Sequence, residues 1–155
     1  MASRRIEDLT FKMQELCYLF SEKMYEKDLP FIITCTSRTI SEQVVLFAQG
    51  RNPLEYVNQL RKSIGFPLIT ETQNKVVTWT MKSRHLVNYV FPKSRAFDIC
   101  LLVSGKPSWD IKISINDNEI PDYDEAGAIG ESVGLKWGGS FKKKDRPHYE
   151  DYDPD

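Results

Sequence analysis

The chain has 155 residues, of which 41% are hydrophobic, 12% aromatic and 28% charged, and this composition is typical of one folded domain rather than a disordered chain. Its formal net charge of -1 gives no general positive surface for phosphates, which argues against a nucleic-acid partner. The N-terminal segment carries charges where a signal peptide needs an apolar core, and no stretch approaches the roughly 18 apolar residues of a membrane span. We therefore expect a monomer without a signal peptide or stable membrane insertion.

The three cysteines, Cys17, Cys35 and Cys100, each lie inside an apolar segment. Their odd number and wide spacing do not form a disulfide pattern, and no Cys-x-x-Cys pair is present. We expect three buried thiols in a reducing cytosol. Ligation of zinc by a cysteine is the weaker alternative.

The first part of the chain alternates helical and extended patterns. Apolar residues recur at steps of three and four over residues 6–24, which predicts a helix docked on its own core. A β-branched and aromatic strand follows over residues 31–36. Thr39 and Glu42 form a capping box that starts the next helix, so Arg38 lies in the turn between a strand and a helix.

The middle of the chain is less regular. Residues 51–64 predict a short helix opened by Pro53. Residues 65–74 are interpreted as a loop or hairpin arm, and residues 75–80 have the composition of a strand.

The second half contains mostly extended patterns. Residues 96–103 form a nearly continuous apolar run that predicts a central strand, and residues 109–115 alternate as a further strand. A helix is expected over 121–134, followed by a Gly-rich aromatic turn over 135–141 and a frayed acidic tail over 151–155. This order predicts an α+β single domain with an antiparallel sheet flanked by helices.

The two histidines of the chain suggest a metal site. A hydrolytic zinc site takes three protein ligands and keeps one position open for water, and His85, Asp98 and His148 would supply that set. Asp145, three residues before His148, would take a proton from the attacking water, and Arg38 would stabilise the oxyanion. Because the histidines lie far apart in sequence, these residues alone leave open that they are two unrelated side chains.

Several motifs follow one another in an order that resembles a known family. They are Arg38 with Glu-Gln at 42–43 and Ala-Gln-Gly-Arg at 48–51, Ser-x-His at 83–85, Ala-x-Asp at 96–98, Gly-Leu-x-Trp-Gly-Gly at 134–139, and Asp-x-Pro-His-Tyr-Glu at 145–150. Together they resemble the zinc-dependent L-alanyl-D-glutamate endopeptidase and D-alanyl-D-alanine carboxypeptidase family of peptidoglycan hydrolases, many of which are phage endolysins.

The resemblance implies a zinc peptidase domain over residues 1–150 with the fold shared by hedgehog domains and D-Ala-D-Ala peptidases. It implies that His85, Asp98 and His148 bind Zn2+, that Asp145 is the catalytic base and that the partner is the peptidoglycan stem peptide. The substrate would be contacted by Arg38, Gln43 and Ser83, and Trp137 would help shape the cleft where the substrate binds.

Two departures from the family pattern have structural consequences. Twelve residues, 86–97, separate His85 from Asp98, with Ser94 at the usual glycine position. This loop must bulge outward if both side chains are to reach one metal. Residues 51–72 resemble an insertion that could cap the cleft.

Three functions compete at this point. The first is an endolysin that cuts the L-Ala–D-Glu bond, is made in the host bacterial cytoplasm and reaches the periplasm and cell wall during lysis. The second is a D-alanyl-D-alanine carboxypeptidase, which needs a pocket for a free carboxylate. The third is a non-catalytic wall-binding domain of the same fold, against which the presence of Asp145 beside His148 argues.

Overall fold

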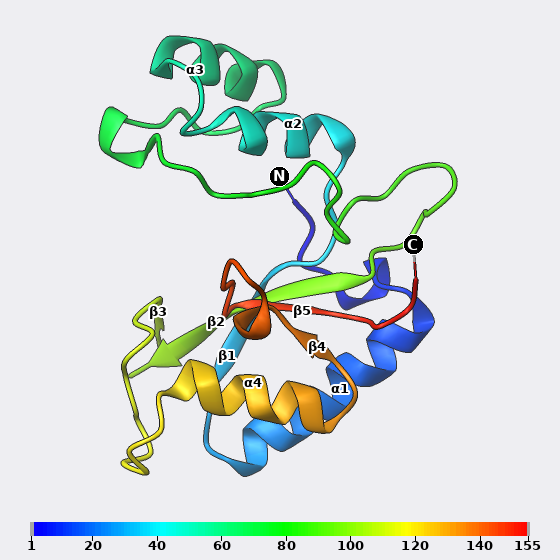
Figure 1. Cartoon of the computed structure of the whole chain (residues 1–155), viewed down its shortest axis with the longest axis vertical. Coiled ribbons are helices and arrows are strands. Elements are labelled where there is room, and N and C mark those ends of the chain that lie inside the picture. Colours follow the sequence, from blue (N-terminus) through cyan, green and yellow to red (C-terminus); the bar gives the residue numbers. More distant parts are fainter. Residues whose placement is uncertain (1, 155) are drawn as a thin grey trace.

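A five-stranded sheet organises the structure, a computed structural model that describes residues 2–154 (Figure 1). Its central strand β2 (Ala96–Val103) pairs with β1 (Phe31–Cys35) along one edge. Along the other edge it pairs with β3 (Lys106–Ser108) and β5 (His148–Glu150), and β4 (Lys136–Trp137) continues the sheet beyond β5. Every pairing is antiparallel, which confirms the predicted α+β class.

Helices α1 (Phe11–Glu26) and α4 (Asp122–Ser132) cover one face of this sheet. Alternate residues of β2, namely Phe97, Ile99 and Leu101, are fully buried against them. Because successive side chains of a strand point to opposite faces, the intervening residues of β2 face away from this core.

On the side away from the core lies a lobe made of α2 (Ile40–Ala48), α3 (Leu54–Ser63) and the short 3-10 helix η2 (Glu71–Gln73), drawn in cyan and green at the top of Figure 1. The predicted capping box is present, since the Glu42 amide donates to Thr39 Oγ1 and the Thr39 amide donates to the Glu42 carboxylate. No helix among the described residues is long and apolar enough to cross a membrane. The three cysteines are free and buried, as expected.

The first helix begins later than its apolar pattern predicts. Residues Ile6–Asp8 form a separate 3-10 turn, η1, and Thr10 then caps α1 by accepting a hydrogen bond from the Met13 amide. Between the two, Leu9 forms a β-bridge with Ser94. The apolar stripe is nevertheless correct, because Leu9, Met13, Phe20 and Met24 belong to one core and the partly buried Ile6 packs against it.

The strand predicted over residues 75–80 is absent. Side chains of the α2 lobe bond this segment instead: Gln43 Nε2 donates to the Thr80 carbonyl, and Arg51 Nη2 donates to the Thr78 carbonyl. A Cβ added to Gly50 would lie 2.2 Å from the Val76 amide nitrogen. The segment therefore packs along the lobe, and side chains replace the hydrogen bonds of a neighbouring strand.

The strand predicted over residues 109–115 is also wrong. Ser104 and Gly105, at φ 50° and 74°, form a tight turn after β2, so pairing resumes at once in β3 and ends at Ser108. A longer β3 would have to pair with the part of β2 near Asp98, where β5 already lies. Two strands, β3 and β5, pair along the same edge of β2. The residues after Ser108 therefore cannot continue to pair with β2.

The chain end is held more firmly than the predicted frayed tail. Asp151 is buried, and its carboxylate accepts hydrogen bonds from Arg84 Nη1 at 2.6 Å and Arg95 Nη2 at 2.8 Å. The prediction of fraying is therefore wrong at this residue.

Candidate metal centre and cleft

Strand register places three potential metal ligands in one row. The Cα partners across the sheet are Cys35 with Asp98 and Asp98 with His148. Because directly opposite residues of antiparallel strands point to the same face, these side chains project together from the face opposite the helical core.

His85 reaches this row from outside the sheet. Its carbonyl accepts a hydrogen bond from the Arg38 amide at 2.8 Å, and the Val87 amide donates to the Arg38 carbonyl at 3.0 Å. The pair of bonds fixes the coil around His85 to the turn between β1 and α2. The loop that follows bulges into solvent, as expected, with Tyr89 fully exposed at its tip.

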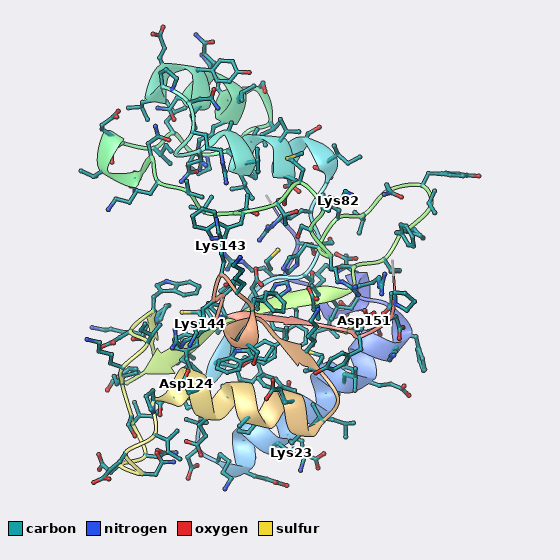
Figure 2. The ribbon with its side chains drawn as sticks, viewed as in Figure 1. Lys23, Lys82, Asp124, Lys143, Lys144 and Asp151 are labelled. Carbon is teal, nitrogen blue, oxygen red and sulfur yellow. The ribbon has the colours of Figure 1, made fainter. Side chains whose placement is uncertain are left out.

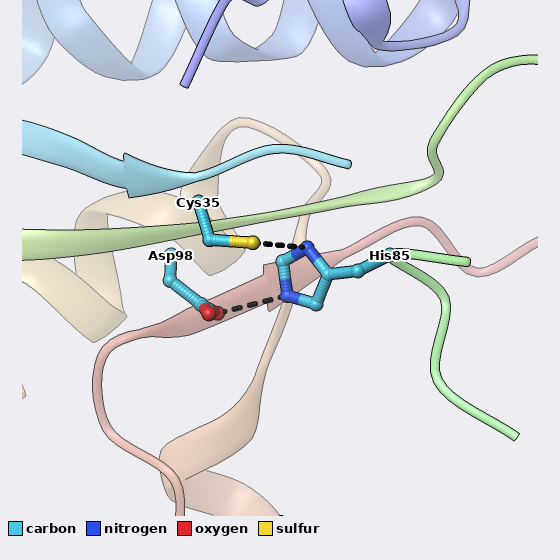
Figure 3. A group of neighbouring side chains, drawn as sticks. All are labelled: Cys35, His85 and Asp98. Carbon is cyan, nitrogen blue, oxygen red and sulfur yellow. Dashed lines mark hydrogen bonds and ion pairs between the residues drawn. The ribbon is translucent and has the colours of Figure 1, made fainter. Parts of the chain in front are cut away.

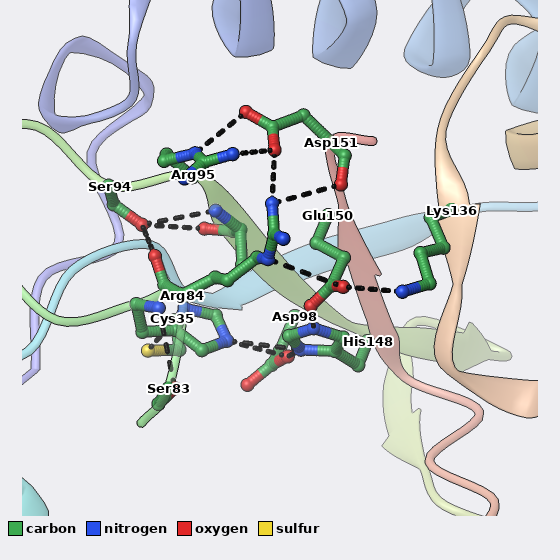
Figure 4. Close-up of polar contacts among 12 residues, drawn as sticks. Cys35, Ser83, Arg84, Ser94, Arg95, Asp98, Lys136, His148, Glu150 and Asp151 are labelled. Atoms are coloured by element: carbon green, nitrogen blue, oxygen red, sulfur yellow. Dashed lines mark hydrogen bonds and ion pairs between the residues drawn. The ribbon is translucent and has the colours of Figure 1, made fainter. Parts of the chain in front are cut away.

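Three side-chain atoms converge within a few ångströms. Asp98 Oδ1 lies 3.0 Å from His85 Nε2 and 3.0 Å from His148 Nδ1, and the two ring nitrogens are 3.2 Å apart. The structure thus brings together the three residues that the sequence suggested as ligands: Figure 4 labels Asp98 and His148, and Figure 3 labels His85 beside Asp98.

The outer nitrogen of each imidazole has its own acceptor. His85 Nδ1 donates to the Thr36 carbonyl at 2.8 Å, and His148 Nε2 donates to Glu150 Oε2 at 2.9 Å. These bonds leave His85 Nε2 and His148 Nδ1 as the nitrogens that face Asp98, so that each would present a lone pair to a metal there once its ring is neutral. A hydrogen bond from a ligating histidine to a carbonyl or carboxylate is the usual outer support of a zinc site.

The spacing fits a small tetrahedral cation. Zinc keeps nitrogen and oxygen ligands about 2.0–2.2 Å away, so two ligand atoms of a tetrahedron lie about 3.3 Å apart. The observed separations of 3.0 to 3.2 Å are close to this value. The donor set of two imidazoles and one carboxylate is also of the kind that catalytic zinc sites use.

Electrostatics at these atoms also favour a cation. Burial by itself lowers the pKa of His85, but the Asp98 carboxylate outweighs burial and raises it to about 10. Burial lowers the pKa of His148 as well, whereas its bonds to Asp98 and Glu150 raise it above the ordinary value. Burial raises the pKa of Asp98, but the two histidines hold it well below its usual range.

Cys35 offers a second grouping at the same place. Cys35, His85 and Asp98 each have a ligand atom within 4.8 Å of the others, so a metal could also be held by this set (Figure 3). The Cys35 sulfur, however, lies 3.6 Å from His85 Nδ1, the nitrogen that donates to the Thr36 carbonyl. A ligand set that includes Cys35 therefore competes with an existing hydrogen bond, while the set that includes His148 does not.

The three converging atoms open onto a cleft of about 710 Å³. Asp145 lies in its wall and is accessible to solvent. Partial burial in the cleft raises the pKa of Asp145, and the Asp98 carboxylate raises it further, while His148, His85 and Arg38 oppose the shift. The cleft also carries basic residues on the loops at its mouth. They are Lys82, Lys142, Lys143 and Lys144, and Figure 2 labels the first, third and fourth of them.

The residues predicted to contact substrate do not all reach the cleft. Arg38 and Ser83 line it. The guanidinium of Arg38 donates to Asp98 Oδ2 at 3.2 Å, which turns the other carboxylate oxygen toward the histidines. Gln43 is fully buried, and its side chain accepts from Arg38 and donates to Thr78 and Thr80. It therefore supports Arg38 and the cleft wall from behind.

Trp137 likewise lies behind the cleft, outside the residues that line it. Its indole packs against Gly127 and Gly139, where an added Cβ would lie 2.4 Å and 2.1 Å from ring atoms. Its Nε1 donates to the Arg146 carbonyl at 2.8 Å. Trp137 thus supports the loop that carries Asp145 and His148.

The part of the α2 lobe formed by residues 51–72 borders the other side of the site. A cavity of about 360 Å³ lies between this lobe and the sheet, with Arg61 and Phe66 on the lobe side. Arg38 and Asp98 line both this cavity and the main cleft. The sequence suggested that residues 51–72 cap the cleft, but none of them is among the residues that line the main cleft, and Arg61, Phe66 and Pro67 line the second cavity instead.

Gly138 allows the loop of Asp145 to pack closely. A Cβ at this position would lie 2.3 Å from the Asp145 carbonyl oxygen and 3.0 Å from His148 Cβ. We expect Gly138→Ala to lower the free energy of unfolding by about 1–3 kcal/mol through overpacking and to lower metal affinity by displacing His148. Urea unfolding and metal titration measure the two effects. Ser140→Ala in the same 3-10 turn is the control, and an equal loss in both variants would contradict this account.

Two residues that support the site had no role assigned from sequence. Glu150 could have been found, because residues two apart in a strand share a face and His148 and Glu150 have that spacing. The carbonyl of Thr36 could not, since nothing in the sequence shows which backbone oxygen a distant imidazole meets.

Comparison with known proteins agrees with this geometry. Residues 77–151 match a family model described as D-alanyl-D-alanine carboxypeptidase. The peptidoglycan L-alanyl-D-glutamate endopeptidase CwlK of Bacillus subtilis (strain 168) is 28% identical over 126 residues. That alignment covers 80% of this chain and 62% of CwlK, so the chain spans less than two thirds of that relative's length.

The fold also has a solved counterpart. The crystal structure of the Serratia marcescens L-Ala D-Glu endopeptidase ChiX superimposes with a TM-score of 0.57 over 97% of this chain and 87% of that chain, at 15% sequence identity. The likeness shows that the two proteins share a fold. Residues 77–151, which contain His85, Asp98, Asp145 and His148, are thus the part of the chain that is similar to the D-alanyl-D-alanine carboxypeptidase family.

Proposed function

We propose that the protein is a zinc-dependent peptidoglycan hydrolase that cleaves the L-Ala–D-Glu bond of the stem peptide. The observation that carries this proposal is the convergence of His85 Nε2, Asp98 Oδ1 and His148 Nδ1 within 3.2 Å, beside Asp145 in an open cleft. The similarity to CwlK, whose name gives this activity, supports the choice of bond.

Each residue of the site would have a separate role in hydrolysis. His85, Asp98 and His148 would hold Zn2+, which lowers the pKa of water and polarises a carbonyl. Asp145 would accept the proton of the attacking water, because it borders the cleft and its pKa is raised above that of a free aspartate. Arg38 would stabilise the oxyanion from the opposite wall, where its guanidinium already faces Asp98.

Zinc binding is expected to release protons at pH 7. Both histidines have raised pKa values, that of His85 about 10, whereas a metal binds only the neutral ring. The metal must therefore displace at least about one proton below pH 10, and the number should fall toward zero as the pH rises through that value. Calorimetric titration with zinc in two buffers of different ionisation enthalpy measures it. Identical heats in both buffers at pH 7 would contradict the expectation.

The bond that is cut can be determined directly. Purified muropeptides would be incubated with the zinc-loaded protein, and the products weighed by mass spectrometry. We expect a fragment that begins with D-Glu and a glycan fragment that keeps L-Ala. The matched control is the protein treated with a chelator and then with zinc, which should lose and regain the activity.

A carboxypeptidase that removes terminal D-alanine is the second candidate. The name of the matching family and the lysines at the cleft mouth, which could bind a free carboxylate, favour it. Release of free D-alanine in the same experiment would support this activity over the first. Zinc-loaded protein that adheres to peptidoglycan without cutting it would support the non-catalytic alternative.

A further inference from the structure

A buried carboxylate joins the three chain segments that carry the converging ligand atoms. Asp151 is 2% exposed. Its Oδ1 accepts from Arg84 Nη1 at 2.6 Å and from Arg95 Nη2 at 2.8 Å, and its Oδ2 accepts from Arg95 Nε at 3.1 Å (Figure 4). Such charge-assisted bonds are strong and directional, above all where little water competes.

The positions of these three residues in the chain are informative. Arg84 directly precedes His85, and Arg95 lies one residue before β2, the strand of Asp98. Asp151 directly follows β5, the strand of His148. Main-chain bonds at the same level, from the Arg95 amide to the Arg84 carbonyl and from the Asp151 amide to the Arg95 carbonyl, bring the segments together.

The Arg84 side chain extends this contact to a ligand. Its Nε lies 3.5 Å from Glu150 Oε1, which also lies 3.4 Å from Lys136 Nζ. The other oxygen, Glu150 Oε2, accepts the hydrogen bond from His148 Nε2 at 2.9 Å. A continuous series of polar contacts therefore runs from Asp151 through Arg84 and Glu150 to the imidazole of His148.

Main-chain bonds alone would not orient these side chains. Arg84 belongs to a coil, and its guanidinium contacts the carboxylates of Asp151 and Glu150, while its Nη1 also donates to the main-chain carbonyls of Asp151 and Asp153. If Asp151 lost its charge, the electrostatic attraction on the Arg84 guanidinium would shift toward Glu150. The Glu150 carboxylate would then shift away from the geometry that holds the His148 ring.

We propose that Asp151 and Arg84 are positioning residues that set the orientation of the His148 imidazole and thereby preassemble the metal site. The inference rests on the proposed function, because it takes His148 as a zinc ligand. It assigns Asp151 no contact with substrate or metal. The two residues act through Glu150, at the end of the domain where the sequence suggested a frayed tail.

The test is the zinc affinity of Asp151→Asn, measured by competition with a chelating indicator, with thermal unfolding of the metal-free protein alongside. We expect zinc binding to weaken by about 10-fold, at the lower end of what loss of an outer partner costs. The control is Asp110→Asn, because that exposed carboxylate lies outside the contacts of Asp151, Arg84 and Arg95. It should bind zinc as the wild type does.

A second variant covers the case that Asp151→Asn does not fold. Arg84→Lys keeps the charge but has a single nitrogen, which cannot reach both Asp151 and Glu150, so the same loss of affinity is expected. A lower unfolding temperature with zinc affinity within about 2-fold of wild type would overturn the proposal and make the cluster a structural anchor only. Wild-type protein that binds no zinc would instead refute the proposed function.

Discussion

Replacing Asp145 by asparagine is expected to lower kcat by about 10²- to 10⁴-fold, the usual contribution of a general base, while the bound zinc is retained. Asparagine has the shape of aspartate but cannot accept a proton. Asp145 belongs to the cleft wall and lies outside the group of converging atoms, so its loss leaves all three proposed ligands in place. This variant should therefore lose activity and keep its zinc content.

The measurement is the initial rate of muropeptide cleavage at saturating substrate, with zinc content determined on the same sample. Asp110→Asn is a suitable control, because that exposed carboxylate lies outside the residues that line the cleft. Its rate should equal that of the wild type. If Asp145→Asn kept more than about half of the wild-type kcat, the proton would have to be taken by another group and the assignment of the base would be abandoned.

The sequence predicted best those elements that its local pattern determines. The apolar run of β2 and the capping box of α2 were both recognised, because each depends on residues within one turn or one strand. The strands expected over 75–80 and 109–115 failed for the opposite reason. Both segments have the composition of a strand, but a strand also needs a free edge, and the edge of β2 is occupied by β3 and β5.

The same distinction applies to the site. His85, Asp98, Asp145 and His148 were identified because their types and spacing match a motif, and the structure brings the first, second and fourth of them within 3.2 Å. What orients these side chains was not predictable. The Thr36 carbonyl is such a partner, and it lies 49 residues from His85 in sequence. Register across the sheet, which no local pattern fixes, decides such contacts.

Gln43 and Trp137 show a further limit of motif matching. Gln43 was expected to contact the substrate, yet it bonds Arg38 from behind, and Trp137, which was expected to help shape the cleft, packs on two glycines outside the residues that line it. A motif marks residues that the site needs, but it does not separate those that touch a ligand from those that hold the walls. In this protein the motif residues Gln43 and Trp137 are of the supporting kind.

The choice between two ligand sets leads to the second large effect. His148→Ala should weaken zinc binding by more than the 10- to 100-fold that loss of an outer partner costs, and activity should be lost with the metal. Cys35→Ser should bind zinc nearly as the wild type does. The reason is that His85 Nδ1, the nitrogen near the Cys35 sulfur, already donates a hydrogen bond to the Thr36 carbonyl. This nitrogen is therefore not available to a metal bound next to the thiol.

When His85 is neutral, its lone pair is on Nε2, which faces Asp98 and His148 at 3.0 and 3.2 Å. A metal bound to His85 Nε2 would lie on the side of the ring that faces His148, whereas the Cys35 sulfur lies near the other ring nitrogen. Zinc content and affinity of the two variants, measured side by side, decide between the sets. Loss of zinc in Cys35→Ser together with its retention in His148→Ala would replace the proposed ligands by Cys35, His85 and Asp98. Loss in both would place the thiol in the coordination sphere as a fourth ligand, a closed arrangement that suits a structural rather than a catalytic zinc.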